Sequence, residues 1–172
     1  MITGGPGSGK TTLINALGKS GFSFLPEVSR EVTSAAQISG IDQLFLEDPL
    51  QFSNALLKAR VEQFRLADQH QGALLFYDRG IPDVMAYLEY LGQPYDAHFL
   101  DYSQEPRYDQ VLFLPPWADI YTQDKERYES FEQSKKIHEY LVKTYEELGY
   151  QSLEIPVGTI EQRIEFVNQR VL

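Results

Sequence analysis

The stretch GGPGSGKTT, residues 4–12, lies almost at the start of the 172-residue chain, and the rest of the sequence is best interpreted outward from it. It matches the pattern Gly-x-x-x-x-Gly-Lys-Thr, whose glycines let the backbone wrap around a phosphate with its N–H groups pointing inward. A helix that begins near Lys10 would direct the positive end of its dipole at the same phosphate. The stretch therefore predicts a nucleotide phosphate site rather than an ordinary glycine-rich turn.

Each polar side chain of this glycine loop has an expected role. Lys10 would reach the β- and γ-phosphates, the Thr11 hydroxyl would be a ligand of Mg²⁺, and Thr12 would support the start of the helix. We therefore expect ATP and Mg²⁺ as cofactors. The expected nucleotide-binding residues are Gly4, Gly5, Gly7, Ser8, Gly9, Lys10, Thr11 and Thr12.

The composition indicates a soluble protein that acts on a small molecule. Hydrophobic residues make up 42% of the chain and charged residues 23%, and 172 residues suffice for one domain, 1–172, with a proper core. The net charge of −10 disfavours nucleic acid and anionic membrane as partners. We see no membrane span or signal peptide in the sequence, and the absence of cysteine fits the reducing cytoplasm. The oligomeric state is left open.

Strand-like and helix-like segments alternate along the chain. We expect strands at residues 1–3, 22–28, 73–78, 111–116 and 152–157. We expect helices at residues 11–20 and 49–71, and two more toward the carboxyl end. Because strands separated by helices need crossover connections, the sequence predicts a parallel sheet in a three-layer α/β fold.

Several helices carry recognisable end signals. Asp48 and Pro49 form a good cap and first residue, Thr159 and Gln162 offer a capping box, and Gly149 is placed to end a long helix. The apolar stripes expected on the last two helices are Ile137, Leu141, Tyr145 and Leu148, and then Ile160, Ile164, Val167 and Val171.

The segment LLFYDRG, residues 74–80, places Asp78 directly after an apolar strand. The second acidic residue of phosphate-binding-loop proteins lies at this position, on or near Mg²⁺. Hydrolysing machines usually follow it with a glutamate that polarises water, whereas Arg79 follows here. An arginine suits the charge on a transferring phosphoryl group or a substrate oxyanion. The alternative is that Asp78 is only a turn residue at a strand end.

The segment LPEVSREV, residues 25–32, places Glu27 and Arg30 just past the second strand. In a parallel sheet this is the carboxyl edge, where ligands bind. A carboxylate there could accept the proton of an attacking hydroxyl, which is the general-base role that a kinase needs. Alternatively, Glu27 and Arg30 pair with each other at a solvated helix start.

The segment PPWADIYTQDKERY, residues 115–128, follows the fourth strand. We expect a lid around residues 115–135, in which Arg127 closes on the phosphates and excludes water. Trp117, Tyr121 and Tyr128 could stack on a flat acceptor ring. The alternative is an ordinary exposed turn with aromatic side chains at its surface.

Taken together, these residues resemble the NadR-like P-loop kinase family, which groups a ribosylnicotinamide kinase domain with AAA-type ATPase-like proteins. The likeness is carried by the glycine loop, Pro26-Glu27, Arg30-Glu31, YDRGIPDVMAYLEYLG at residues 77–92, Asp124, Arg127, and YEELGYQSLEIP and TIEQRIEFV near the carboxyl end. It implies a nucleotide-kinase-like P-loop NTPase fold with strand order 2-3-1-4-5, ATP with Mg²⁺, and an acceptor near the Asp-Arg pair. The substrate-contacting residues so implied are Glu27, Arg30, Asp83, Tyr87 and Asp124.

These observations favour a small-molecule kinase that moves the γ-phosphoryl of ATP to a hydroxyl of a nucleoside-like or other small metabolite. The catalytic residues expected are Lys10, Glu27, Asp78, Arg79 and Arg127, with Thr11 and Asp78 at the metal. The main alternative is a nucleotide-dependent regulatory switch or ATPase with weak or no kinase activity. A guanine-specific Asn-Lys-x-Asp run is absent from the sequence, so GTP selectivity has no visible basis.

Overall fold

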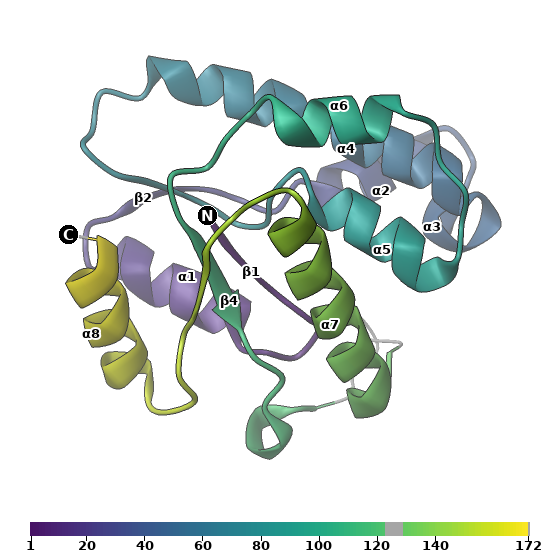
Figure 1. Cartoon of the computed structure of the whole chain (residues 1–172). Coiled ribbons are helices and arrows are strands. Elements are labelled where there is room, and N and C mark those ends of the chain that lie inside the picture. Colours follow the sequence, from purple (N-terminus) through teal and green to yellow (C-terminus); the bar gives the residue numbers. More distant parts are fainter. Residues whose placement is uncertain (123–128, 172) are drawn as a thin grey trace.

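The computed structural model describes residues 1–122 and 129–171, in which helices cover short parallel strands (Figure 1). The strands are β1 (Ile2–Gly4), β2 (Ser23–Leu25), β3 (Leu75–Tyr77), β4 (Val111–Leu114) and β5 (Ser152–Glu154). The helices are α1 (Lys10–Lys19), α2 (Ser29–Ile38), α3 (Leu44–Glu47), α4 (Pro49–Leu66), α5 (Asp83–Leu91), α6 (His98–Gln104), α7 (Phe131–Glu147) and α8 (Ile160–Val171), with 3-10 turns η1 (Ala67–Gln69) and η2 (Ala118–Ile120). The expected α/β class is confirmed.

The strands form two parallel ladders. One has the order β1-β4-β5 and the other pairs β2 with β3. An isolated parallel bridge between Ile2 and Asp78 joins the ladders, and the Arg79 N–H donates to the Ile2 carbonyl at 2.9 Å. Both ladders agree with the predicted strand order 2-3-1-4-5. Only this one bridge joins the end of β3 to β1 in the described residues, so the full five-strand order stays a prediction.

The alternation of side chains along β4 divides the core into two faces. Val111 and Phe113 pack with α7 on one face, while Leu112 and Leu114 pack with α1 and α8 on the other. Figure 1 shows α1 and α8 on one side of β1 and β4 and α7 on the opposite side. The three-layer arrangement follows from this alternation.

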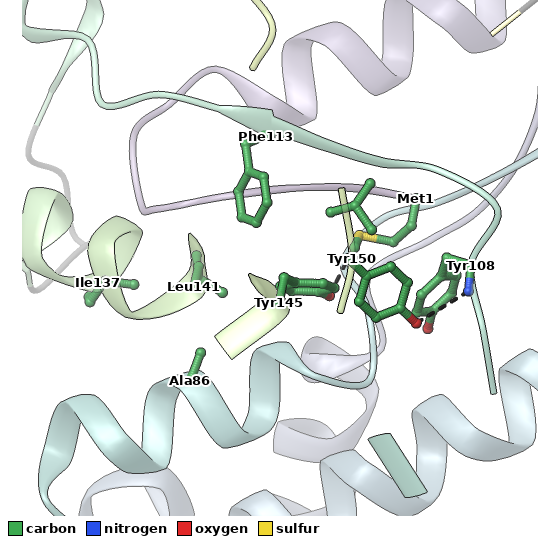
Figure 2. Close-up of a cluster of buried hydrophobic side chains, with 9 residues drawn as sticks. Met1, Ala86, Tyr108, Phe113, Ile137, Leu141, Tyr145 and Tyr150 are labelled. Atoms are coloured by element: carbon green, nitrogen blue, oxygen red, sulfur yellow. Dashed lines mark hydrogen bonds between the residues drawn. The ribbon is translucent and has the colours of Figure 1, made fainter. Parts of the chain in front are cut away.

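The stripe predicted on α7 forms one core cluster. Ile137, Leu141 and Tyr145 are buried, and Leu148 packs at the margin of the cluster. Figure 2 shows these buried side chains facing Phe113 of β4. The rings of Phe113 and Tyr145 lie 5.5 Å apart at 87°, the edge-to-face geometry that aromatic pairs prefer.

The capping signals of α4 and α8 are confirmed. The Asp48 carboxylate accepts a hydrogen bond from the Gln51 N–H at 2.9 Å. The Thr159 N–H donates to Gln162 Oε1 at 2.9 Å, and the Gln162 N–H donates to Thr159 Oγ1 at 3.4 Å. On α8, Val167 is buried in a second core cluster, which it shares with residues of α1 and β4. The other predicted stripe residues of α8 lie half-buried against this second cluster.

The helices α2, α3 and α6 give a weaker sequence signal than the helices on the faces of the sheet. Ala36 is the buried residue of α2, and Leu44 that of the one-turn α3, so neither shows a stripe. Residues of α2, α4, α5 and α6 contribute to or pack against a third core cluster, whose buried members are Val28, Leu56, Leu57, Val61, Ile81, Val84, Met85, Leu88 and Phe99. None of the helices in the described ranges combines the length and apolar character needed to cross a bilayer.

Replacing Asp48 with alanine should lower the free energy of unfolding by about 1 kcal/mol, because the first turn of α4 loses its side-chain acceptor. The matched control is Asp48→Asn, which keeps an acceptor oxygen and should stay within a few tenths of a kcal/mol of the parent, as expected for about equal caps. Urea unfolding of the three proteins measures both differences. Equal losses in the two variants would mean that the charge, and not the hydrogen bond, stabilises the helix start.

Candidate functional site

The glycine loop connects the end of β1 to the start of α1 in a conformation that glycine permits. Gly7 and Gly9 have φ values of 74° and 84°, in the left-handed region. A Cβ atom on Gly4 would lie 2.6 Å from the Leu114 carbonyl oxygen, and one on Gly5 would lie 2.7 Å from the Ser134 carbonyl oxygen. The close approach of backbone segments therefore requires glycine at both positions.

Two side chains from the carboxyl half support this loop from behind. Ser134 Oγ on α7 donates to the Pro6 carbonyl at 2.6 Å, and Arg163 Nη1 on α8 donates to the Ser8 carbonyl at 3.2 Å. The Arg163 guanidinium also lies 4.8 Å from the Trp117 ring centroid. Sequence reasoning missed both supports. The available signal for Arg163 was an arginine on the buried face of an amphipathic helix.

Lys10 and Asp78 form an ion pair at the base of the loop. Both residues are 8% exposed, and the Lys10 ammonium donates to Asp78 Oδ1. Burial lowers the pKa of Lys10, and nearby Arg79 adds to this effect, while the Asp78 carboxylate opposes it. The pair brings together the two charged residues that the sequence assigned to phosphate and metal.

A cavity of about 540 Å³ opens above this ion pair. Residues 5–12 of the glycine loop form one wall. The rest of the lining includes six residues with charged or aromatic side chains: Glu27, Arg30, Asp78, Arg79, Tyr87 and Glu129. The predicted nucleotide residues other than Gly4, together with Glu27, Arg30 and Tyr87 of the predicted acceptor residues, thus line one space, which we call the phosphate cavity.

The features of the loop fit a bound phosphate and a hard cation. The Ser8 hydroxyl is buried and has no hydrogen-bond partner within the described part of the chain. Thr11 and Thr12 are exposed toward the cavity. In residues 1–122 and 129–171 there is no cluster of three or more histidine, cysteine or carboxylate side chains suited to a metal. Thr11 and Asp78, the Mg²⁺ ligands predicted from the sequence, both line the cavity.

Glu27 lies between two guanidinium groups. Its Oε1 accepts from Arg60 Nη2 at 2.9 Å, and its Oε2 pairs with Arg79 Nε. Burial by itself would raise the pKa of Glu27, but Arg60, Arg79 and Lys10 outweigh burial and hold it at about 2. Within the described residues Glu27 pairs with these two arginines and not with Arg30, so the alternative pairing expected from sequence is not observed.

Arg79 has an uncommon backbone conformation. Its φ of 74° lies in the left-handed region, where a residue with a side chain is strained. Its guanidinium is fixed by the pairing with Glu27, by Asp83 Oδ2 at 3.2 Å from Nη1, and by the Tyr87 ring at 5.7 Å. Burial by itself would lower the pKa of Arg79, but Tyr87 and the carboxylates of Glu27 and Asp83 outweigh burial and raise it, so Arg79 stays cationic.

Asp83 was expected to contact the acceptor, but its side chain is fully buried. Its carboxylate accepts from Thr3 Oγ1 at 2.6 Å and from the Tyr145 hydroxyl at 2.7 Å, besides Arg79. A Cβ on Gly80 would overlap the same Tyr145 hydroxyl. These contacts allow Asp83 to orient Arg79 from below rather than to touch a ligand.

A second cavity of about 480 Å³ adjoins the phosphate cavity and lies among α2, α3, α4 and α5. Phe45, Phe52, Tyr87 and Tyr90 contribute aromatic rings to its wall. Glu27, Ser29, Arg79, Tyr87 and Glu129 line both cavities. The two spaces therefore meet at Glu27 and Arg79, and we call the second one the acceptor cavity.

Arg60 is a further site residue that sequence reasoning missed. It is 5% exposed, and its Nη1 donates to the Gly80 carbonyl at 2.8 Å while Nη2 binds Glu27. Along α4 it lies on the buried face with Leu56, Leu57 and Val61. A charged residue inside an apolar stripe was the signal that could have identified it.

Part of the predicted lid can be located. The Trp117 Nε1–H donates to Asp119 Oδ2 at 3.2 Å, and the Tyr121 hydroxyl donates to the Glu129 carbonyl. The Tyr121 ring lies against Gly7, so these aromatic side chains lie beside the glycine loop and do not line the acceptor cavity. The predicted roles of Asp124, Arg127 and Tyr128 fall on residues outside the described ranges.

Comparison with known proteins identifies one matching family model and several solved structures with a similar fold. A family model described as an AAA domain matches residues 1–163. A search of curated proteins found no match. The fold is similar to that of a deoxyadenosine kinase from M. mycoides solved with the products dCMP and a flexible dCDP, with a TM-score of 0.73, 14% identity, and coverage of 99% of this chain and 96% of that chain.

Two other solved structures share the fold. A NadR protein in complex with NR gives a TM-score of 0.74 and 19% identity over 97% of this chain, which spans 48% of the NadR chain. A thymidylate kinase from Candida albicans gives a TM-score of 0.66 and 18% identity, with coverage of 98% of this chain and 89% of that chain. At these identities the likeness establishes a common fold.

The depressed pKa of Glu27 predicts a loss of stability in acid. The folded pKa of about 2 lies below the ordinary value of 4.5, so its contribution is complete above about pH 4.5 and disappears as the pH falls toward 2. Its size is on the order of 2–3 kcal/mol for a side chain that is largely buried.

Urea unfolding at about pH 6 and about pH 3 measures this contribution in the parent and in Glu27→Gln. The variant should be less stable at the higher pH and should lose less stability between the two. Glu62→Gln, a change at an exposed carboxylate of α4, is the control and should keep the parent's pH difference. A Glu27→Gln protein with the full parental difference would show that other carboxylates cause the acid sensitivity.

Proposed function

The chain belongs to the AAA domain family, and from that premise we propose that it is a small-molecule kinase that uses ATP. It would transfer the γ-phosphoryl group to a hydroxyl of a nucleoside-like or other small metabolite. The observation that carries the proposal is the meeting of the phosphate cavity and the acceptor cavity at Glu27 and Arg79. The kinases that share the fold support the same class of reaction.

On the phosphate side, the chain supplies backbone amides and one ammonium group. The glycine loop would enclose the phosphates, and Lys10 would exchange its bond to Asp78 for bonds to β- and γ-phosphate oxygens. Thr11 and Asp78 would hold Mg²⁺, which when bound neutralises charge on the phosphates. Water exclusion by the walls of the cavity strengthens each of these contacts.

On the acceptor side, Glu27 would accept a hydrogen bond from the attacking hydroxyl. A carboxylate with a pKa of about 2 is ionised at neutral pH but is a weak base, so we assign it to orienting the hydroxyl more than to early proton removal. The acceptor oxygen bonds to the γ-phosphorus as the bond from that phosphorus to the ADP oxygen breaks. The hydroxyl proton then leaves to Glu27 or to water.

Arg79 would stabilise the charge on the transferring group, since it faces both cavities and remains cationic. Arg30 and Tyr87 would contact the ligand from the same wall. Asp83 acts through Arg79 and is a positioning residue. Each predicted site residue within the described ranges thus has one of three proposed roles: binding the phosphates, binding the acceptor, or positioning another residue of the site.

Incubation of the protein with γ-labelled ATP and a small-molecule cell extract tests the proposal. The label should appear in an organic phosphate, and its appearance should require the extract. If all of the released label is free phosphate with every acceptor pool, the kinase function is wrong. An ATPase or a nucleotide-dependent regulatory protein would then explain the site better.

The variant Lys10→Ala should weaken binding of Mg·ATP by about 10- to 100-fold, because charge-assisted bonds to phosphate are lost. The matched control is Lys19→Ala, which removes an exposed lysine at the far end of the same helix. Isothermal titration calorimetry of the two variants and the parent measures the affinities. Circular dichroism verifies that each variant is folded, and parental affinity in folded Lys10→Ala would contradict the assignment.

A further inference from the structure

Two hydrogen bonds hold the glycine loop by its carbonyl groups. One runs from Ser134 Oγ on α7 to the Pro6 carbonyl, and the other from Arg163 Nη1 on α8 to the Ser8 carbonyl. Because α7 and α8 cover opposite faces of the sheet, the loop is held from both sides (Figure 1). Both donor residues are buried, so water competes little for these bonds.

Peptide planarity links each of these bonds to the direction of a backbone N–H group. In a trans peptide the C=O of one residue and the N–H of the next point in opposite directions, and no peptide bond in the described ranges is cis. Gly7 and Gly9, which follow the two held carbonyls, line the phosphate cavity, whereas Ser134 and Arg163 do not. Each bond behind the loop therefore turns one N–H group toward the cavity.

The two N–H groups have no other task in the described part of the chain. Within residues 1–122 and 129–171, neither the Gly7 N–H nor the Gly9 N–H donates a hydrogen bond. Both residues have φ in the left-handed region, and glycine by itself populates many other conformations as readily. A loop without an external hold would have to be ordered when a ligand binds, at a cost in entropy.

Arg163 also brings a positive charge to the back of the loop. Within the described residues its hydrogen bonds go to the Pro156 and Ser8 carbonyls, and its Nη2 is buried without a partner. Burial lowers the pKa of Arg163, and no carboxylate in the described ranges opposes this effect. A Cβ on Gly9 would lie 3.0 Å from Arg163 Nη1, so the charge lies directly behind this backbone. An anion on the other side of the loop would offset part of the cost of burying it.

Resting on the nucleotide binding that the proposed kinase function requires, we infer that Ser134 and Arg163 are positioning residues that direct the Gly7 and Gly9 N–H groups at the phosphates of the nucleotide. Each side chain acts through the peptide group whose carbonyl it binds, and the bond to that carbonyl polarises the N–H of the same group. Arg163 adds a charge that favours an anion, so its removal should have the larger effect on affinity.

Amide NMR spectroscopy of the isotope-labelled protein tests the inference without a catalytic step. In the parent, a non-hydrolysable Mg·ATP analogue should move the Gly7 and Gly9 amide proton resonances downfield, because both groups then bind phosphate. Ser134→Ala should reduce the shift of Gly7 and leave that of Gly9, and Arg163→Gln should do the reverse. Parental shifts in both variants would overturn the inference. Equal loss of both shifts in each variant would also overturn it, since it would reveal only a general structural role.

Isothermal titration calorimetry with the same analogue measures the effect on affinity. Ser134→Ala should weaken binding about 3- to 10-fold and Arg163→Gln about tenfold or more, because one neutral and one charged hydrogen bond to the loop are lost. The matched controls are Ser103→Ala and Arg107→Gln, at residues whose side chains donate to carbonyls outside the loop, and both should bind as the parent does.

The affinities separate failure of the inference from failure of the proposed function. Circular dichroism verifies that each variant is folded. Parental affinity in folded Ser134→Ala and Arg163→Gln would overturn the inference while nucleotide binding stands. A folded parent that does not bind the analogue would reject the kinase function, and the inference with it.

Discussion

A cluster of buried charges at the carboxyl ends of the strands is the constraint on which the remaining structure depends. Lys10, Asp78 and Asp83 are all less than one-tenth exposed, as is Arg60, and each has an ionic partner. Buried charges cost free energy to desolvate, and a set of paired charges is weak evidence for stability. Their concentration around two adjoining cavities points to ligand chemistry as the reason for keeping them.

The elements of the fold meet at this cluster because each one contributes a charge or a support. The helix α1 provides Lys10, α4 provides Arg60, and the end of β3 provides Asp78 and Arg79. The core cluster beneath α7 reaches the site through Tyr145, whose ring lies among the side chains of Figure 2 and whose hydroxyl binds Asp83. Packing of the α7 face and orientation of Arg79 are thus mechanically connected.

Local patterns predicted much of the fold. The alternation of apolar strands with helices, the cap at Asp48 and the capping box at Thr159 depend on neighbouring residues, so the sequence reveals them directly. The predicted strand at residues 22–28 shortens to Ser23–Leu25, and the helix predicted at 49–71 ends at Leu66, because polar and turn residues at the margins do not contribute to regular pairing.

The site was predictable where a motif is contiguous and not where it is assembled in space. The glycine loop and Asp78-Arg79 are each continuous in sequence. Three site residues are far from their partners in sequence: Arg60 is 33 positions from Glu27, Ser134 is 128 positions from Pro6, and Arg163 is 155 positions from Ser8. No local spacing in the sequence encodes such contacts. The acceptor cavity could not be predicted for the same reason, since residues from α2, α3, α4, α5 and α7 line it together.

The most direct measurement is a crystal structure of the protein with Mg²⁺ and a non-hydrolysable ATP analogue. The account predicts that the phosphates lie in the glycine loop, that the Lys10 ammonium has left Asp78 for phosphate oxygens, and that Asp78 faces the metal. A nucleotide bound elsewhere, with the Lys10–Asp78 pair intact, would contradict it.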